Sequence, residues 1–328
     1  MNALAAALAR LGKAALTLLA VVILSFVLIR LAPGDPALLL AGDSGAGDAA
    51  FVEEIRRDLG LDRGLDVQLI SYLTSVARLD FGVSYREKRP VAEMVLERVP
   101  ATLLLTASAL VFAIVAGIGL GACAARRPGS LLDGAITVVS VTFFAMPMFW
   151  VGLMFIIVFA VQLGWLPSYG MVDATSGQQG RGSALVDVLR HMVLPVLTLG
   201  LYYMSVLARV SRTALLQVAG ADFIRTAKAK GLSPRLIWRH HLFRNALAPI
   251  ITVVALQAAQ LVGGSVLVET VFAWPGIGRF AFEALMTRDY NVLLAVFILT
   301  SFGVIVVNLL ADTAYHLIDP RIDQAAAT

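Results

Sequence analysis

Six long apolar stretches constrain what this chain of 328 residues can fold into. A helix that crosses the roughly 30 Å hydrocarbon core of a bilayer needs about 17 to 25 residues, and each stretch supplies that many. Apolar residues make up 59% of the chain and charged residues 15%, whereas soluble domains have about 45–50% and about 25%. The surplus apolar surface must face lipid, so we expect an all-α membrane protein with six transmembrane helices. The predicted spans are residues 14–31, 101–125, 134–162, 192–208, 247–268 and 292–311.

The distribution of basic residues predicts the orientation of these spans. Residues 209–246 hold eight Lys or Arg and one acid, and further basic residues lie at 10, 13, 126 and 127. Basic segments stay on the cytoplasmic side. In a six-span chain the three basic segments, residues 10–13, 126–127 and 209–246, all fall on one face, so we expect this face and both termini to be cytoplasmic. We therefore expect a cytoplasmic N-terminus with the first helix in 1–32, an extracytoplasmic segment in 33–97, a five-helix core in 98–312 and a cytoplasmic tail in 313–328.

The first span is expected to be an uncleaved signal anchor, because its apolar run exceeds the usual 7 to 15 or so residues of a signal peptide. Within the extracytoplasmic segment, residues 51–59 and 67–79 show the spacing of short amphipathic helices.

The sequence lacks the residues that several classes of function require. The predicted span interiors hold no Asp, Glu, Lys or His, which argues against an ion-coupled carrier. The chain contains no P-loop, zinc-binding H-E-x-x-H or nucleophile elbow, and its single cysteine, Cys123, excludes an internal disulfide. We therefore expect a non-enzymatic membrane protein. An energised transporter subunit, a passive channel and a membrane scaffold stay open.

The basic segment after the fourth span has more local structure than topology requires. Gly231 suits a helix C′ position with positive φ, Ser233 an N-cap, and Pro234 the first position of the next helix. Two short helices and a firm corner are expected, with apolar side chains for a cytoplasmic partner. A DNA-binding role is disfavoured because both arms are tethered to spans. The apolar side chains are Phe223, Ile224, Leu236, Ile237 and Trp238.

This segment resembles the "EAA" loop of ABC importer permeases. The match runs through Arg225-Thr226-Ala227 to Gly231, although the glutamate of the general motif is absent. The surrounding residues 222–233 are similar to the variant in the dipeptide/oligopeptide/nickel branch. Residues 31–36, 59–62, 79–84, 98–103, 269–278, 288–290 and 319–321 resemble the same branch, which usually has Pro where this chain has Asn291.

The resemblance implies a type I ABC importer permease in the inner membrane of a bacterium. It implies a homologous second permease, two ATPase subunits that bind ATP and Mg²⁺, and an extracytoplasmic solute-binding protein, with no cofactor or metal in this chain and no nucleic acid partner. The solute would be a dipeptide or oligopeptide, or alternatively nickel or another small solute. The ATPase-coupling residues would be Asp222, Arg225, Thr226, Ala227, Gly231, Ser233 and Pro234.

Two further sets of candidate residues follow. Pro275, Gly276 and Gly278 form a tight turn that is a candidate contact for the binding protein or an outer gate. Gln257 and Gln260 lie one turn apart and are candidates for the translocation path, with hydrogen bonding between helices as the alternative.

Overall fold

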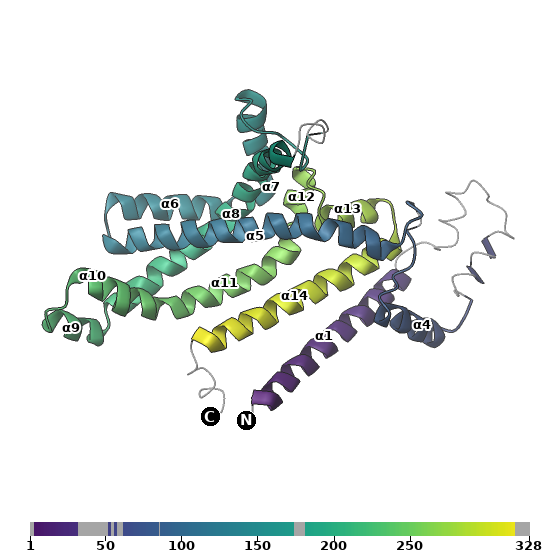
Figure 1. The fold of residues 1–328 in the computed structure, drawn as a ribbon, viewed down its shortest axis with the longest axis horizontal. Helices are drawn as coiled ribbons and strands as arrows, with labels where there is room; N and C mark the ends of the chain where they lie inside the picture. Colours follow the sequence, from purple (N-terminus) through teal and green to yellow (C-terminus); the bar gives the residue numbers. More distant parts are fainter. Residues whose placement is uncertain are drawn as a thin grey trace. The chain divides into compact units, whose positions relative to one another are not determined.

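The computed structural model describes residues 3–31, 52–53, 56–57, 62–84, 86–173 and 181–318. Every regular element within these ranges is helical, apart from one isolated β-bridge between Val83 and Pro90 (Figure 1). Two π-helical stretches, Ile156–Gln162 and Ile237–Phe243, continue α7 and α10. The helices are α1 (Ala3–Leu31), α4 (Leu65–Ala77), α5 (Val91–Arg126), α6 (Leu131–Ala145), α7 (Met148–Phe155), α8 (Arg181–Ala219), α9 (Asp222–Ala229), α10 (Pro234–Leu236), α11 (Arg244–Gly264), α12 (Val266–Val271), α13 (Ile277–Met286) and α14 (Tyr290–Ile318).

The apolar helices agree with the expected spans, with one correction. Five helices are long and apolar enough to cross a membrane, and α6 with α7 and its π-helical end form a sixth only as a pair bent by 104°. The expectation of one continuous helix over 134–162 is therefore wrong. Met146 adopts an extended ψ of 137° before Pro147, as residues before proline prefer, and Pro147 has no N–H to continue the helix.

Several helices extend beyond the apolar stretches that predicted them. α5 begins at Val91, ten residues before the expected start, and α8 runs through 39 residues instead of the expected 192–208. Charged residues end an apolar run without ending a helix, which explains the difference. The fifth stretch is split, because α11 ends at Gly264 and α12 begins at Val266.

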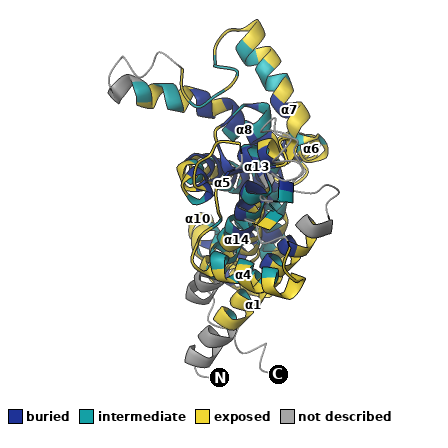
Figure 2. Cartoon of the chain, turned by 90° about the vertical axis from the view of Figure 1, so that its right-hand side faces the viewer, coloured by how far each residue is buried: buried dark blue, intermediate teal, exposed yellow. Residues whose placement is uncertain are grey.

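The chain divides into two compact units, and the first comprises residues 1–98 and 280–303. In this unit α1 packs on α4, with the Phe26 and Tyr72 rings 5.6 Å apart. The exposed face of α1, yellow in Figure 2, is apolar and suits lipid. α4 confirms the amphipathic helix expected over 67–79, whereas 51–59 and the motifs at 31–36 and 319–321 lie mainly or wholly outside the described residues.

The second unit, residues 99–279 and 304–328, is built around α8. α6, α7 and α11 pack along α8, and α5 approaches it closely at Gly117 and Gly121. A Cβ at Gly121 would lie 2.5 Å from the Ala208 carbonyl oxygen, so only glycine permits this approach. Leu199, Leu207 and Leu215 are fully buried in the resulting core.

Candidate functional site

The corner predicted from the basic segment is present between α8 and α11 (Figure 1). Gly231 has φ +74°, and the Leu232 N–H donates to the Ala227 carbonyl over 3.3 Å, which closes the end of α9. The Ser233 hydroxyl accepts a hydrogen bond from Leu236 N, and Pro234 is the first residue of α10. These conformations confirm the local structure expected of Gly231, Ser233 and Pro234.

The second arm of the corner is longer than expected. α10 has three residues, but it continues through the π-helical stretch into α11, so that one apolar helix runs from Pro234 to Leu261. The expectation of two short helices is therefore right for α9 and wrong for α10. The corner therefore joins two long helices of the unit, α8 and the helix that continues as α11.

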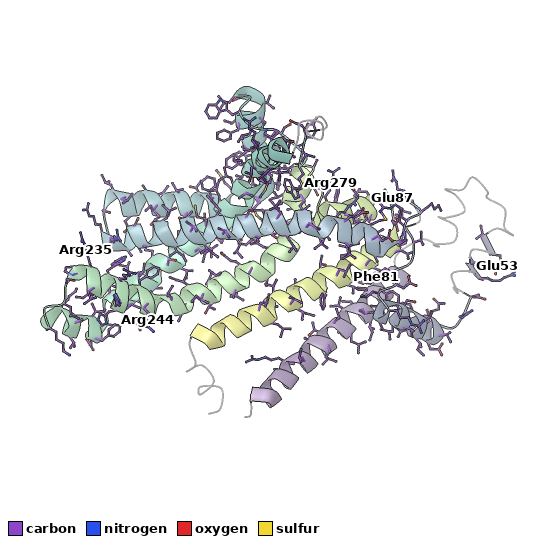
Figure 3. All side chains as sticks on the ribbon, viewed as in Figure 1. Glu53, Phe81, Glu87, Arg235, Arg244 and Arg279 are labelled. Atoms are coloured by element: carbon purple, nitrogen blue, oxygen red, sulfur yellow. The ribbon has the colours of Figure 1, made fainter. Side chains whose placement is uncertain are left out.

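The side chains of the corner divide into an inward and an outward set. Ile224, Ala227 and Ile237 are buried and pack against Val218 of α8 and Leu232. Expected as partner-facing residues, Ile224 and Ile237 instead hold the corner to the helices beneath it. The outward set includes Arg235, labelled in Figure 3, and the exposed residues Asp222, Phe223, Arg225, Thr226, Gly231, Ser233, Pro234 and Leu236.

A buried carboxylate, which the sequence reasoning missed, lies at the other end of α11. Glu269 of α12 is 0% exposed. Its Oε1 accepts hydrogen bonds of 2.9 Å from the hydroxyls of Thr102 and Ser265, and its Oε2 accepts 3.0 Å from Arg279 N. The bond from Arg279 N satisfies a free N–H in the first turn of α13, where a negative charge is also favoured. An acid at the end of an apolar run was the signal that could have revealed it.

The candidate gate residues surround this carboxylate. A Cβ at Gly276 would collide with the Glu269 carboxylate, and one at Gly278 would lie 2.7 Å from Val266 Cα. Trp274 is fully buried, and its Nε1 donates to the Ala101 carbonyl over 2.8 Å. Only Pro275 of the three candidates is exposed. The two glycines thus allow close packing, and Pro275 forms the surface of the turn.

The candidate path residues are not brought together. Gln257 is 3% exposed, and its Nε2 donates to the Tyr203 carbonyl of α8 over 3.1 Å. Gln260 is exposed on α11. This hydrogen bond joins α11 to α8, which is the alternative role that the sequence left open for Gln257.

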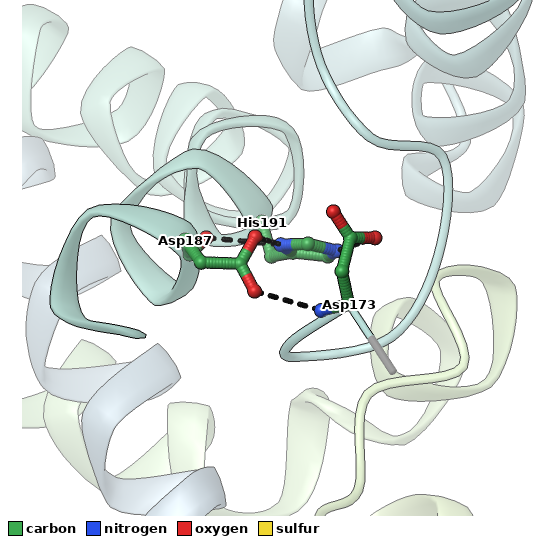
Figure 4. A group of neighbouring side chains, drawn as sticks. All are labelled: Asp173, Asp187 and His191. Carbon is green, nitrogen blue, oxygen red and sulfur yellow. Dashed lines mark hydrogen bonds and ion pairs between the residues drawn. The ribbon is translucent and has the colours of Figure 1, made fainter. Parts of the chain in front are cut away.

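A group of two acids and a histidine anchors the chain before α8 (Figure 4). His191 Nδ1 lies 2.9 Å from the Asp187 carbonyl and so donates, while Nε2 lies 3.6 Å from Asp173 Oδ1. The Asp173 N–H donates to Asp187 Oδ2 over 2.7 Å. The three residues each offer one possible ligand atom, and these atoms lie within 4.8 Å of one another. His191 Nδ1 and Asp187 Oδ2 are already engaged in the hydrogen bonds described, so the group links Asp173 to the first turns of α8.

The long apolar helices, five of them long enough to span and a sixth as a bent pair, are those of a multi-pass membrane protein. A chain of the MetNI methionine ABC transporter has the same fold, with a TM-score of 0.56 and 20% identity over 69% of this chain and 96% of that chain. The expected type I ABC importer permease fold is thereby confirmed. The chain belongs to the family of binding-protein-dependent transport system inner membrane components, whose model matches residues 117–324 and whose N-terminal model matches residues 4–106.

Curated relatives are similar over nearly the whole chain. A di/tripeptide transport system permease protein of Pseudomonas aeruginosa is 39% identical over 95% of this chain and 97% of the relative. A dipeptide transport system permease protein of Escherichia coli K12 is 35% identical over 96% and 97%. A glutathione transport system permease protein of Salmonella choleraesuis is 39% identical over 93% and 94%.

Family membership confirms the main functional prediction. The chain is a non-catalytic, multi-pass inner membrane subunit of an ABC importer, which implies ATPase and binding-protein partners. It favours the importer over the passive channel and the scaffold that the sequence left open.

Proposed function

We propose that this chain forms half of a membrane path for short peptides. The three relatives described above are named for dipeptides, di- and tripeptides, and glutathione, which is itself a tripeptide. A homologous second permease would supply the other half, two ATPase subunits would bind ATP and Mg²⁺, and an extracytoplasmic protein would deliver the solute. The basic segments support a cytoplasmic location of both termini and of the corner, because cytoplasmic loops carry an excess of Lys and Arg.

The observation that carries this proposal is the corner between α8 and α11. Its outward residues are exposed, whereas its inward residues are packed on the end of α8. Such a surface is rigid enough to transmit a displacement and exposed enough to bind in a cavity on an ATPase subunit. The residues that would contact or shape this docking are Asp222, Arg225, Thr226, Ala227, Gly231, Ser233 and Pro234.

At the other end of α11, we assign the exposed Pro275 turn to contact with the binding protein or to an outer gate. Gly276 and Gly278 would support this turn through their close packing around Glu269. The exposed Gln260 would face the path, and Gln257 would hold α11 on α8.

The test is uptake by the reconstituted complex. The chain, its second permease and its ATPase subunits are placed in liposomes with the loaded binding protein outside and ATP inside. A labelled dipeptide should accumulate only with ATP and the binding protein, and the chain alone should hydrolyse no ATP. Accumulation of nickel but not of any di- or tripeptide would overturn the peptide assignment. Downhill flux without ATP would instead indicate a channel.

A further inference from the structure

A partly buried ion pair joins α8 to α6 on the side of the corner. Arg212 Nε donates to Asp133 Oδ1 over 2.5 Å, and its second terminal nitrogen donates to Oδ2 over 2.8 Å. Asp133 is 4% exposed, and its Oδ2 also accepts 2.9 Å from Gly129 N. Ser130 caps the same helix by accepting a bond from Asp133 N over 3.3 Å. The start of α6 is therefore held in one position against α8.

Stable packing of α6 on α8 does not by itself require this ion pair. Replacing a buried ion pair by apolar side chains is often neutral or stabilising, so stability alone is a weak reason to keep one. A bidentate guanidinium–carboxylate contact adds a fixed distance and register between the two helices. A second contact reinforces the same pairing, because the Arg209 guanidinium lies 4.4 Å from the centre of the Phe144 ring of α6.

The pair lies on the helix that carries the corner. From Arg212, α8 continues without a break to Ala219, and the Ala221 N–H donates to the Val218 carbonyl over 3.1 Å before α9 begins. Ile224 of α9 packs on the same Val218. A displacement of α9 is therefore carried into the end of α8 and reaches Arg212 within two turns.

From Asp133 the connection continues along α6 to the bend at Pro147 and into α7. α7 packs against both α8 and α12, and a Cβ at its Gly152 would lie 3.1 Å from the Phe272 ring, beside the Glu269 cluster. The ion pair thus joins the corner to the one strongly bent span among the described helices, and that span reaches the opposite end of the unit.

We propose that Asp133 and Arg212 are positioning residues that make α6 move together with α8 when the ATPase subunits displace the corner. This inference rests on the proposed function. This positional role requires no contact with nucleotide or solute. The pair determines how much of the motion at the corner reaches α7 and the outer turn, and therefore how much solute is moved for each ATP hydrolysed.

The experiment measures hydrolysis and uptake on the same reconstituted complex, with the chain level quantified. Arg212→Gln leaves the buried Asp133 carboxylate without its partner, and Asp133→Asn leaves the partly exposed Arg212 without its own, so the level of folded chain should fall, more in Arg212→Gln. The double variant Asp133→Asn with Arg212→Gln removes both charges, so the level should recover. Uptake per ATP hydrolysed should stay about fivefold or more below wild type in the double variant, a typical size for coupling between sites.

Asp133→Glu tests rescue, because it keeps the charge and should recover much of the lost ratio. The matched control is Arg89→Gln with Glu97→Gln, which removes another bidentate arginine–carboxylate pair, with contacts of 2.5 and 3.3 Å. That pair is half exposed and lies far from α8 in the sequence, so its removal should leave the ratio unchanged.

A double variant that recovers both level and ratio would show that the pair is only structural and would overturn the proposal. An unchanged ratio in the single variants, once corrected for chain level, would overturn it as well. Failure of the proposed function looks different, because the wild-type complex itself would then show no ATP-dependent uptake of peptide.

Discussion

The hydroxyl of Thr102 donates a 2.9 Å hydrogen bond to Glu269 Oε1, across 167 residues of sequence. The same hydroxyl oxygen accepts 2.8 Å from Ile277 N, so one threonine connects α5, α12 and the start of α13. Because Glu269 is fully buried, its hydrogen bonds come only from the protein around it. The turn that contains Pro275 is thus built on a single carboxylate.

Replacing that carboxylate should loosen the turn. Glu269→Gln replaces one acceptor oxygen by an NH₂ group that faces a donor, and a buried hydrogen-bonding group left without its partner costs roughly 1–3 kcal/mol. We expect a lower melting temperature of the purified chain in detergent. Glu97→Gln is the control, since Glu97 is half exposed and water replaces its partner. Equal melting temperatures for wild type and Glu269→Gln would contradict a structural role of the cluster.

Substitution of Gly231 should impair the corner through the backbone conformation alone. A Cβ there meets nothing within 4 Å, but φ is +74°, which costs an L-residue roughly 1–2 kcal/mol. Gly231→Ala should weaken co-purification of the ATPase subunits and reduce uptake, and Gly231→Val should do so more strongly because a β-branched residue resists positive φ. The spans should still insert, so the chain level in the membrane stays the same.

The matched control for this substitution is Gly220→Ala, in the turn on the other side of α9. A Cβ at Gly220 would make only ordinary contacts, and positive φ is not found there. Normal uptake by Gly231→Val, or equal loss in Gly220→Ala, would show that the left-handed conformation at Gly231 has no part in coupling.

Substitutions at two glycines of α5 can distinguish the effect of close helix packing from the effect of helix propensity. Gly121→Val should destabilise the chain by roughly 1–3 kcal/mol, because its Cβ would collide with the Ala208 carbonyl and overpack the contact. Gly119→Val makes the same change two residues earlier, where nothing lies within 4 Å. Thermal unfolding of the two variants should therefore differ, with Gly121→Val melting lower. Similar melting curves would argue against a close α5–α8 contact.

The orientation can be tested by cysteine labelling. Cys123 is exposed and is the one cysteine of the sequence, so Cys123→Ala provides the background. An impermeant thiol reagent should label Ser71→Cys, on the exposed face of α4, in intact cells. It should label Ser233→Cys only after permeabilisation. Labelling of Ser233→Cys from outside would reverse the orientation and remove the basis for ATPase docking.

The sequence alone determined the elements whose information is local. Apolar stretches of sufficient length located the membrane helices, because crossing a bilayer depends on the summed hydropathy of consecutive residues. Gly231, Ser233 and Pro234 predicted the corner, because each has a conformational or capping preference that acts within one turn of helix. The resemblance to the permease family likewise rested on short contiguous motifs.

Only the tertiary structure decided how these elements are joined. Two buried carboxylates, those of Asp133 and Glu269, each fall one residue outside a predicted span, and their partners Arg212 and Thr102 lie 79 and 167 residues away. Hydropathy and helical periodicity describe neighbours along one helix and carry no information about which side chain of another helix completes a hydrogen bond. For the same reason the sequence left the role of Gln257 open until α8 and α11 were placed side by side.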